Sequence, residues 1–212
     1  MSINIENNSG GVSPRKKINI RYMATVGLLS ALSTVLMYIE FSVPFMPAFI
    51  KCDVSDLPAL VASFSLGPVA GVLTQLLKNL LHLPVTTTSG VGELANFILG
   101  AAFVLPAGII YRYVKNKKGA LIGSLAGMLA MAATSFPVNL FITYPFYTNF
   151  MPLEAIIGAY SAINPAVDSL PEALLMFNVP FTAAKGLISV IITFLVYKRI
   201  SPLLRGKPKA LK

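Results

Sequence analysis

Long apolar blocks separated by short polar stretches constrain the fold of this chain more than any other feature of its sequence. They cover roughly residues 19–43, 57–83, 91–113, 119–143 and 179–198. Each block is near the ~20 residues that a helix needs to cross a bilayer. Because 55% of the residues are hydrophobic and only 12% are charged, the composition is that of a polytopic membrane protein.

The block 57–83 is interrupted in its middle by the sequence SLGP at Ser65–Pro68. Adjacent Gly and Pro residues favour a break, so two short helices are expected here, either tilted or covered by their neighbours. The prediction is an all-α protein with six transmembrane helices in one membrane domain, residues 18–201. The expected helices are 19–43, 55–66, 68–83, 90–114, 119–143 and 178–200; the extracellular loops are 44–54 and 144–177, the second with short helices; the cytoplasmic tails are 1–17, disordered, and 202–212, basic.

The basic residues favour six spans over five. Five spans would leave the cluster Arg112–Lys118 outside, against the positive-inside rule. With six spans both termini are cytoplasmic, and every Lys and Arg except Lys51, Lys78 and Lys185 falls on that side. We therefore interpret the net charge of +9 as a signal of topology and of attraction to anionic membrane lipid, and expect no nucleic-acid binding. With one Cys and one His, an intrachain disulfide and a Cys/His metal cluster are excluded.

Polar side chains recur at helical spacing in the outer halves of the predicted helices. A charged residue such as Lys185 costs roughly 2.5–3.5 kcal/mol near the bilayer centre, and normally faces a partner or a cavity. One interpretation is that Lys185 only pairs with Glu93 or extends to the interface. We favour an outward-opening cavity for a neutral polar heterocycle, in which Glu93 balances the charge of Lys185. The residues behind this prediction are Gln75, Lys78, Asn79, His82, Glu93, Asn96, Ser135, Asn139, Thr143, Asn178, Thr182 and Lys185.

Two outer segments, 41–58 and 143–178, are rich in aromatic residues and are expected to close this cavity. Side chains such as Phe45 and Tyr144 are suited to covering the face of a flat ring. The alternative is that these aromatic residues form a belt at the membrane interface.

Small residues follow one face of the first predicted helix. Ala24, Gly27 and Ala31 lie three and four residues apart, and such a face lets another helix approach closely. We expect a partner protein to contact this face near the cytoplasmic side.

Three motifs, together with the small residues Gly27 and Ala31, give the chain a family resemblance over roughly residues 18–201. KNLLH at Lys78–His82, GELANFILG at Gly92–Gly100 and PFTAAKG at Pro180–Gly186 resemble those of the riboflavin-specific substrate-binding (S) component of energy-coupling-factor vitamin transporters. The resemblance implies a multi-pass protein of a prokaryotic plasma membrane, with six helices and both ends cytoplasmic. It implies no enzyme activity and no cofactor: riboflavin is the transported ligand. The implied partners are a transmembrane coupling (T) protein, against the helix 1 face, and two ABC-type ATPases.

The resemblance also assigns roles to individual residues. Asn139 and Lys185 match polar residues that hydrogen-bond the pyrimidine edge of the isoalloxazine ring. The family usually has Pro-Phe-Asn-x-x-Lys on its last helix, where this chain has Thr182 at the Asn position, and Asn178, one turn outward, is a candidate to compensate. Flavin mononucleotide is left open as a second substrate.

Other interpretations were weighed against this one. An S component for thiamine or biotin is the nearest alternative. A solitary secondary transporter would need inverted repeats and an ion site near the midplane, and the sequence shows neither. An intramembrane metalloprotease would need paired His and Glu ligands that the lone His82 does not supply, and SGVG at Ser89–Gly92 is only a faint match to a serine protease.

Overall fold

A computed structural model describes residues 20–47 and 49–204 of the chain, with side chains as far as residue 195. The predicted tail at 1–17 and most of the tail at 202–212 lie outside the described residues. Within this part the protein is mostly helical, and four stretches are long and apolar enough to cross a membrane. These are Ile20–Tyr38, Val91–Tyr113, Lys117–Tyr147 and Leu170–Leu195.

The first half of the chain forms three packed helices. Helix α1 (Ile20–Tyr38) is followed by α2 (Asp56–Leu66) and α3 (Pro68–His82). The predicted break is confirmed: α2 and α3 are separated by Gly67, whose φ of 104° favours glycine, and Pro68 begins α3. Helix α2 packs against α1, α3, α4 and α9, so its shortness is compatible with burial inside the helical bundle.

Helices α4 (Val91–Tyr113) and α5 (Lys117–Val138) form the most extensive helix pair. Glycines of α5 lie directly on the backbone of α4: a Cβ added at Gly127 would come within 2.1 Å of the Phe103 carbonyl oxygen. Such small residues allow two helix backbones to approach closely. Around this contact, Phe103, Leu60, Met131 and other apolar side chains of α2, α4, α5 and α9 form the main core.

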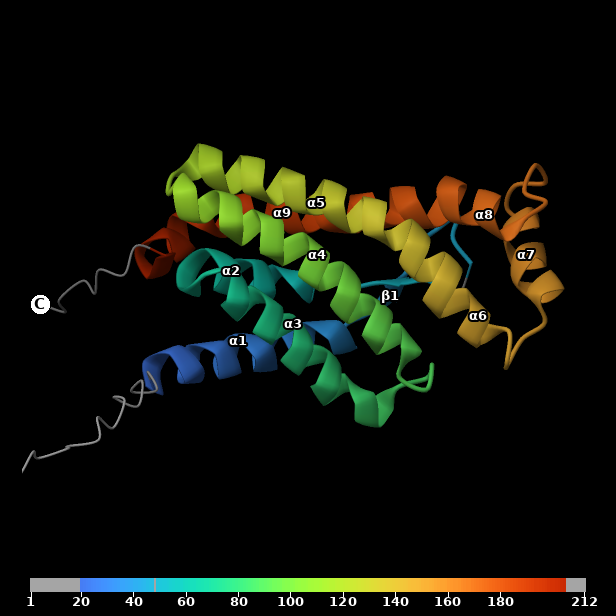
Figure 1. The fold of residues 1–212 in the computed structure, drawn as a ribbon, viewed down its shortest axis with the longest axis horizontal. Coiled ribbons are helices and arrows are strands. Elements are labelled where there is room, and N and C mark those ends of the chain that lie inside the picture. The colour runs from blue at the N-terminus through green and yellow to red at the C-terminus, as the bar shows by residue number, and fades with distance from the viewer. Residues whose placement is uncertain (1–19, 48, 205–212) are drawn as a thin grey trace, which may run out of the picture.

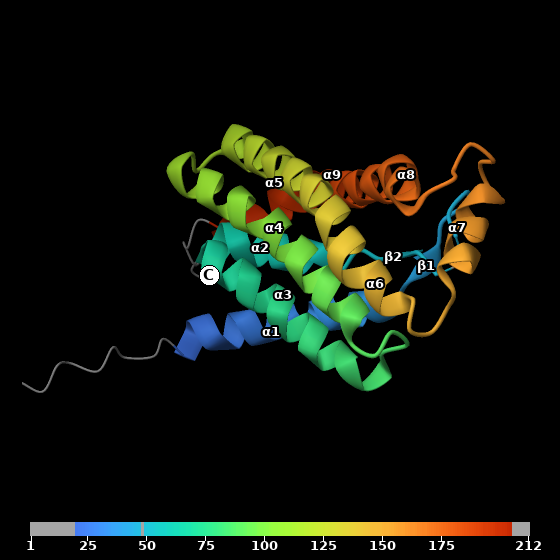
Figure 2. The same ribbon diagram turned by 45° about the vertical axis from the view of Figure 1, so that its right-hand side comes forward.

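The outer segments are more structured than loops. A short antiparallel hairpin of β1 (Phe41–Ser42) and β2 (Lys51–Cys52) precedes α2, a feature that the all-α prediction did not include, and α1 ends at Tyr38, before the expected residue 43. The second segment contains the expected short helices, and Figure 2 shows β1 and β2 near them. The elements of this segment are η2 (Asn139–Thr143), α6 (Tyr144–Tyr147), α7 (Leu153–Ser161), α8 (Leu170–Ala173) and η3 (Leu174–Asn178). A 3₁₀ turn, η1 (Leu83–Val85), lies between α3 and α4.

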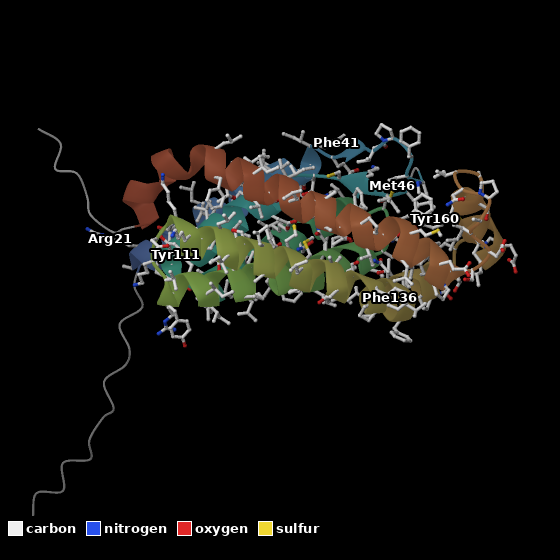
Figure 3. The ribbon with its side chains drawn as sticks, turned by 90° about the horizontal axis from the view of Figure 1, so that it is seen from above. Arg21, Phe41, Met46, Tyr111, Phe136 and Tyr160 are labelled. Atoms are coloured by element: carbon white, nitrogen blue, oxygen red, sulfur yellow. The ribbon has the colours of Figure 1, made fainter. Side chains whose placement is uncertain are left out.

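The two ends of the molecule differ in what they carry. In Figure 1 the start of α1, the turn between α4 and α5 and the end of α9 (Val179–Leu204) lie at one end, whereas α7 and α8 lie at the other. Figure 3 shows the same polarity, with Arg21 and Tyr111 at one end and Tyr160 toward the other. The basic turn 112–118 is therefore at the opposite end from the aromatic outer segments.

Candidate functional site

A cavity of about 240 Å³ opens at the end of the molecule that carries the hairpin and α6. Its walls come from α1, the β1–β2 hairpin, α3, α4, α5, η2, α6, η3 and α9. A second cavity of about 250 Å³ adjoins it, and its lining shares Phe49, Lys51, Thr87, Thr88 and Tyr147 with the first. Ligand sites of ~300–1,000 Å³ are usual in proteins, and the two cavities together reach that size.

Most residues that the sequence selected line this cavity. They are His82, Glu93, Asn96, Asn139, Thr143, Tyr144, Asn178, Thr182 and Lys185. Phe45 does not line the cavity: it lies in the β1–β2 connection, where its side chain is 83% exposed and its φ is 63°. Phe49, four residues further along the same connection, is the aromatic residue that the structure places in the wall.

Two wide helical turns, η2 and η3, place the side-chain amides of Asn139 and Asn178 on the cavity wall. In η2 the Tyr144 N–H donates to the Asn139 carbonyl, and in η3 the Val179 N–H donates to the Leu174 carbonyl, five residues back in each case. A proline follows immediately after each of these donors, Pro145 and Pro180. Because a proline ring clashes with the carbonyl four residues before it, the wider π turn relieves a clash that a regular helix would create.

The charge of Lys185 is balanced by residues other than the expected one. Its Nζ lies 2.9 Å from Asp53 Oδ2 and 3.7 Å from Asp56 Oδ2, so the prediction that Glu93 balances it is wrong. Asp53 follows β2 and Asp56 begins α2. The chain between the hairpin and α2 turns inward, so that Asp53 lines the cavity and Asp56 is fully buried without lining it.

A second buried lysine completes this group. Lys78 Nζ donates to Asp56 Oδ1 and to Ser55 Oγ, each at 2.7 Å, and the side chains of Lys78 and Asp56 are both fully buried. Gln75 Nε2 donates to the same Asp56 oxygen at 2.9 Å. Two lysines and two aspartates cancel in charge, the condition under which ionised groups persist in a poor solvent. We call Asp53, Asp56, Lys78 and Lys185 the buried charge cluster.

Asp53 remains ionised within this cluster. Burial raises the pKa of its carboxyl, but the charges of Lys185 and Lys78 outweigh burial, and the net effect holds the pKa below its usual range. The carboxylate also accepts a hydrogen bond from the Ser55 N–H at 2.8 Å.

Glu93 is bound to the connection between α3 and α4. Its Oε1 lies 2.9 Å from His82 Nδ1, and its Oε2 accepts from the hydroxyls of Thr86 at 2.8 Å and Thr88 at 3.2 Å. One turn further along α4, the Asn96 amide contacts the sulfur of Met37 at 3.8 Å, a weak acceptor. Glu93 thus anchors the start of α4, and Asn96 retains hydrogen-bonding capacity toward the cavity.

The amide of Asn178 is engaged by two tyrosines. Its Oδ1 accepts from the Tyr160 hydroxyl at 2.7 Å, and its Nδ2 donates to the Tyr144 hydroxyl at 3.1 Å. The two tyrosine hydroxyls also contact one another. Burial raises the pKa of Tyr160, so this hydroxyl stays protonated. The triangle joins α7 to the cavity wall, and sequence reasoning gave no role to Tyr160.

The residues proposed for partner contact lie on an open face. Ala24, Gly27 and Ala31 are all exposed, and a Cβ built at Gly27 would meet nothing within 4 Å. Of the residues that the structure describes, no group of three or more His, Cys, Asp or Glu is placed to hold a metal ion.

Residues 21–197 match the family described as "ECF transporter, substrate-specific component". The chain belongs to this family. The S-component resemblance read from the three motifs is thereby confirmed, and the match extends over all four apolar stretches of the fold.

Relatives and a solved structure agree with this assignment of the S component. The riboflavin transporter RibU of Staphylococcus aureus (strain TCH60) is 32% identical over 194 residues, which cover 90% of this chain and 97% of the relative. The riboflavin transporter FmnP of Bacillus subtilis (strain 168) is 28% identical over 188 residues, covering 87% and 94%. A structure described as "Structure and mechanism of the S component of a bacterial ECF transporter" superposes with a TM-score of 0.69 at 31% identity, covering 87% of this chain and 98% of its own.

Proposed function

We propose that this S component binds riboflavin and mediates its uptake. The observation that carries the proposal is the cavity, where amides, hydroxyls and the ammonium group of the buried Lys185 surround one space beside aromatic side chains. Relatives that cover nearly the whole chain are named as riboflavin transporters. A flat heterocycle with a polar edge and an apolar face fits this combination of groups.

The polar edge of the ring is assigned to Asn139, Thr182 and Lys185. All three are buried and line the same cavity. Lys185 can only donate hydrogen bonds, whereas Asn139 and Thr182 offer both donors and acceptors. Phe49 and Tyr144, whose ring centroids are 6.5 Å apart, supply apolar surface for the ring, and Phe45 remains a candidate to cover the cavity mouth.

We further propose six crossings, with α2 and α3 as two short spans and both termini in the cytoplasm. The basic end of the molecule then faces the cytoplasm and the cavity faces outward, in agreement with the positive-inside rule. The protein accordingly lies as a multi-pass protein in the plasma membrane of a prokaryote, with residues 1–17 and 202–212 as cytoplasmic tails.

The coupling partners are proposed from the family. A transmembrane T protein docks on the exposed face of α1 at Ala24, Gly27 and Ala31, whose small size permits close helix contact. Two ABC-type ATPase subunits supply the energy through that protein.

Titration of the purified protein tests the ligand. Riboflavin, flavin mononucleotide, thiamine and biotin are each added to the protein in detergent, and heat is measured. Binding of riboflavin with no binding of thiamine or biotin supports the proposal, and the flavin mononucleotide arm decides whether the phosphate is accepted. Binding of thiamine or biotin alone would contradict it.

A substitution then tests the site. Lys185→Met keeps the apolar stem and removes the charged donor, which should cost about 1.5–3 kcal/mol, or roughly ten- to a hundredfold in affinity. Lys117→Met is the matched control, because Lys117 is exposed at the start of α5 and far from the cavity. Unchanged affinity in folded Lys185→Met protein would remove Lys185 from the site.

A further inference from the structure

A lysine needs an anchor before it can serve as a fixed donor. Its ammonium group sits on a flexible four-carbon stem and can rotate among partners. In this structure Lys185 and Asp53 both line the cavity. Lys185 Nζ lies 2.9 Å from Asp53 Oδ2. An ammonium held by one carboxylate retains further N–H groups for a ligand.

The neighbouring carboxylate is already occupied by other donors. Asp56 Oδ1 accepts from Lys78 and from Gln75, and Asp56 is fully buried without lining the cavity. Its Oδ2 lies 3.7 Å from Lys185 Nζ, too far for a hydrogen bond. Asp53 is therefore the carboxylate that fixes the position of the ammonium group.

Asp53 is itself held firmly. Its Oδ1 accepts from the Ser55 N–H at 2.8 Å, which closes a local turn between a side chain and the backbone. Ser55 is fixed in turn, since its hydroxyl accepts from Lys78 at 2.7 Å and its carbonyl accepts from the Ser33 hydroxyl. The chain leaving β2 is thus connected through Asp53 to α9, through Lys78 to α3 and through Ser33 to α1.

We propose that Asp53 is a positioning residue for ligand recognition. It holds the Lys185 ammonium at the cavity wall, so that one N–H is directed at the polar edge of the ligand, and it ties the connection after β2 to α9. Without Asp53, the nearest remaining carboxylate oxygen is Asp56 Oδ2, and the ammonium is drawn toward that buried group and away from the ligand. This inference rests on the proposed riboflavin-binding function.

A double-mutant cycle on riboflavin affinity tests whether Asp53 acts through Lys185. Asp53→Asn, Lys185→Met and the double variant are titrated with riboflavin in detergent. We expect Asp53→Asn to bind about tenfold more weakly, the size of one charge-assisted hydrogen bond. The double variant should bind no more weakly than Lys185→Met alone. Glu154→Gln, which removes an exposed carboxylate on α7 outside the cavity lining, should match the parent.

Thermal unfolding without ligand provides an independent readout. Asp53→Asn leaves the buried charge cluster with one excess positive charge, which lowers the melting temperature. The double variant removes one charge of each sign, so its melting temperature should return toward that of the parent. A purely local structural role of Asp53 predicts instead that the two losses add.

The outcomes separate this inference from the proposed function. If the parent fails to bind riboflavin, the function is wrong. If the parent binds but the losses in the cycle add, or Asp53→Asn binds as tightly as the parent, only the role of Asp53 is overturned. Should Asp53→Asn fail to fold, the double variant is compared with Lys185→Met: equal affinity supports the proposal, and a further loss overturns it.

Discussion

The contact between α4 and α5 at Gly127 allows a prediction with an unusual sign. Replacing glycine by alanine inside a helix ordinarily stabilises it by roughly 0.5–1 kcal/mol. At Gly127 the added Cβ would lie 2.1 Å from the Phe103 carbonyl oxygen and 3.1 Å from its ring. Ordinary contact begins near 3.4 Å, and the obstructing atom belongs to the backbone of α4, so the helices have to separate by about an ångström.

This separation disturbs the main core, because Phe103 and Met131 are packed there and almost fully buried. Overpacking of this kind typically costs about 1–3 kcal/mol. At about 2–4 °C per kcal/mol for a chain of this size, we expect the melting temperature of Gly127→Ala to fall by roughly 2–12 °C.

Far-UV circular dichroism of the protein in detergent measures this effect, since the chain has no Trp and the helical signal is strong. Gly27→Ala is the control: it lies inside α1 and a Cβ there meets nothing within 4 Å, so its melting temperature should stay the same or rise. If Gly127→Ala is as stable as Gly27→Ala, the close approach of α4 and α5 is not present in the protein.

Three further predictions address the membrane topology, the coupling to a partner protein and the contact between Tyr160 and Asn178. Lys117→Cys in a Cys52→Ser background should resist an impermeant thiol reagent added to intact cells and react once the membrane is opened; labelling from outside would refute the six-span topology. Replacing Gly27 and Ala31 by Phe should abolish riboflavin uptake while leaving affinity in detergent unchanged, because both residues lie on the exposed face of α1; an equal loss of affinity would place that face in the site. Tyr160→Phe removes the hydroxyl bonded to Asn178 and should weaken riboflavin binding by about 1–3 kcal/mol, measured by titration, whereas unchanged affinity would make the tyrosine triangle irrelevant to the ligand.

The positions of polar residues along their helix axes were predictable from the sequence, whereas their hydrogen-bond and ion-pair partners were not. Spacing and span length placed Asn139, Thr182 and Lys185 at the outer side of the bundle, and the structure brings them to one cavity. Their rotation about the helix axes relative to a loop cannot be read from spacing. For that reason Lys185 was assigned to Glu93, whereas the inward turn of the chain after β2 gives it to Asp53.

Proline residues in the sequence predicted one structural feature and left others undetermined. The break at Gly67 was recognised because Gly and Pro are adjacent there, and the structure has the break. Pro145 and Pro180 carry a comparable signal, but a proline in an apolar helix is as compatible with a kink as with a wide turn. Tyr160 offered no signal, since its role depends on hydroxyl contacts with residues 16 and 18 positions away.

The two wide turns, η2 and η3, make the length of the chain at these points as important as its composition. Deleting one of Leu140, Phe141 or Ile142 would remove the extra residue of η2 and force the chain toward a regular helix. In such a helix the Pro145 ring clashes with the carbonyl four residues before it, and each residue contributes about 100° of rotation. Tyr144 and Tyr147, which line the cavity beyond η2, would then face another direction although every side chain of the wall was still present. A single-residue deletion, harmless in most surface connections, would here dismantle the cavity without removing any residue of its wall.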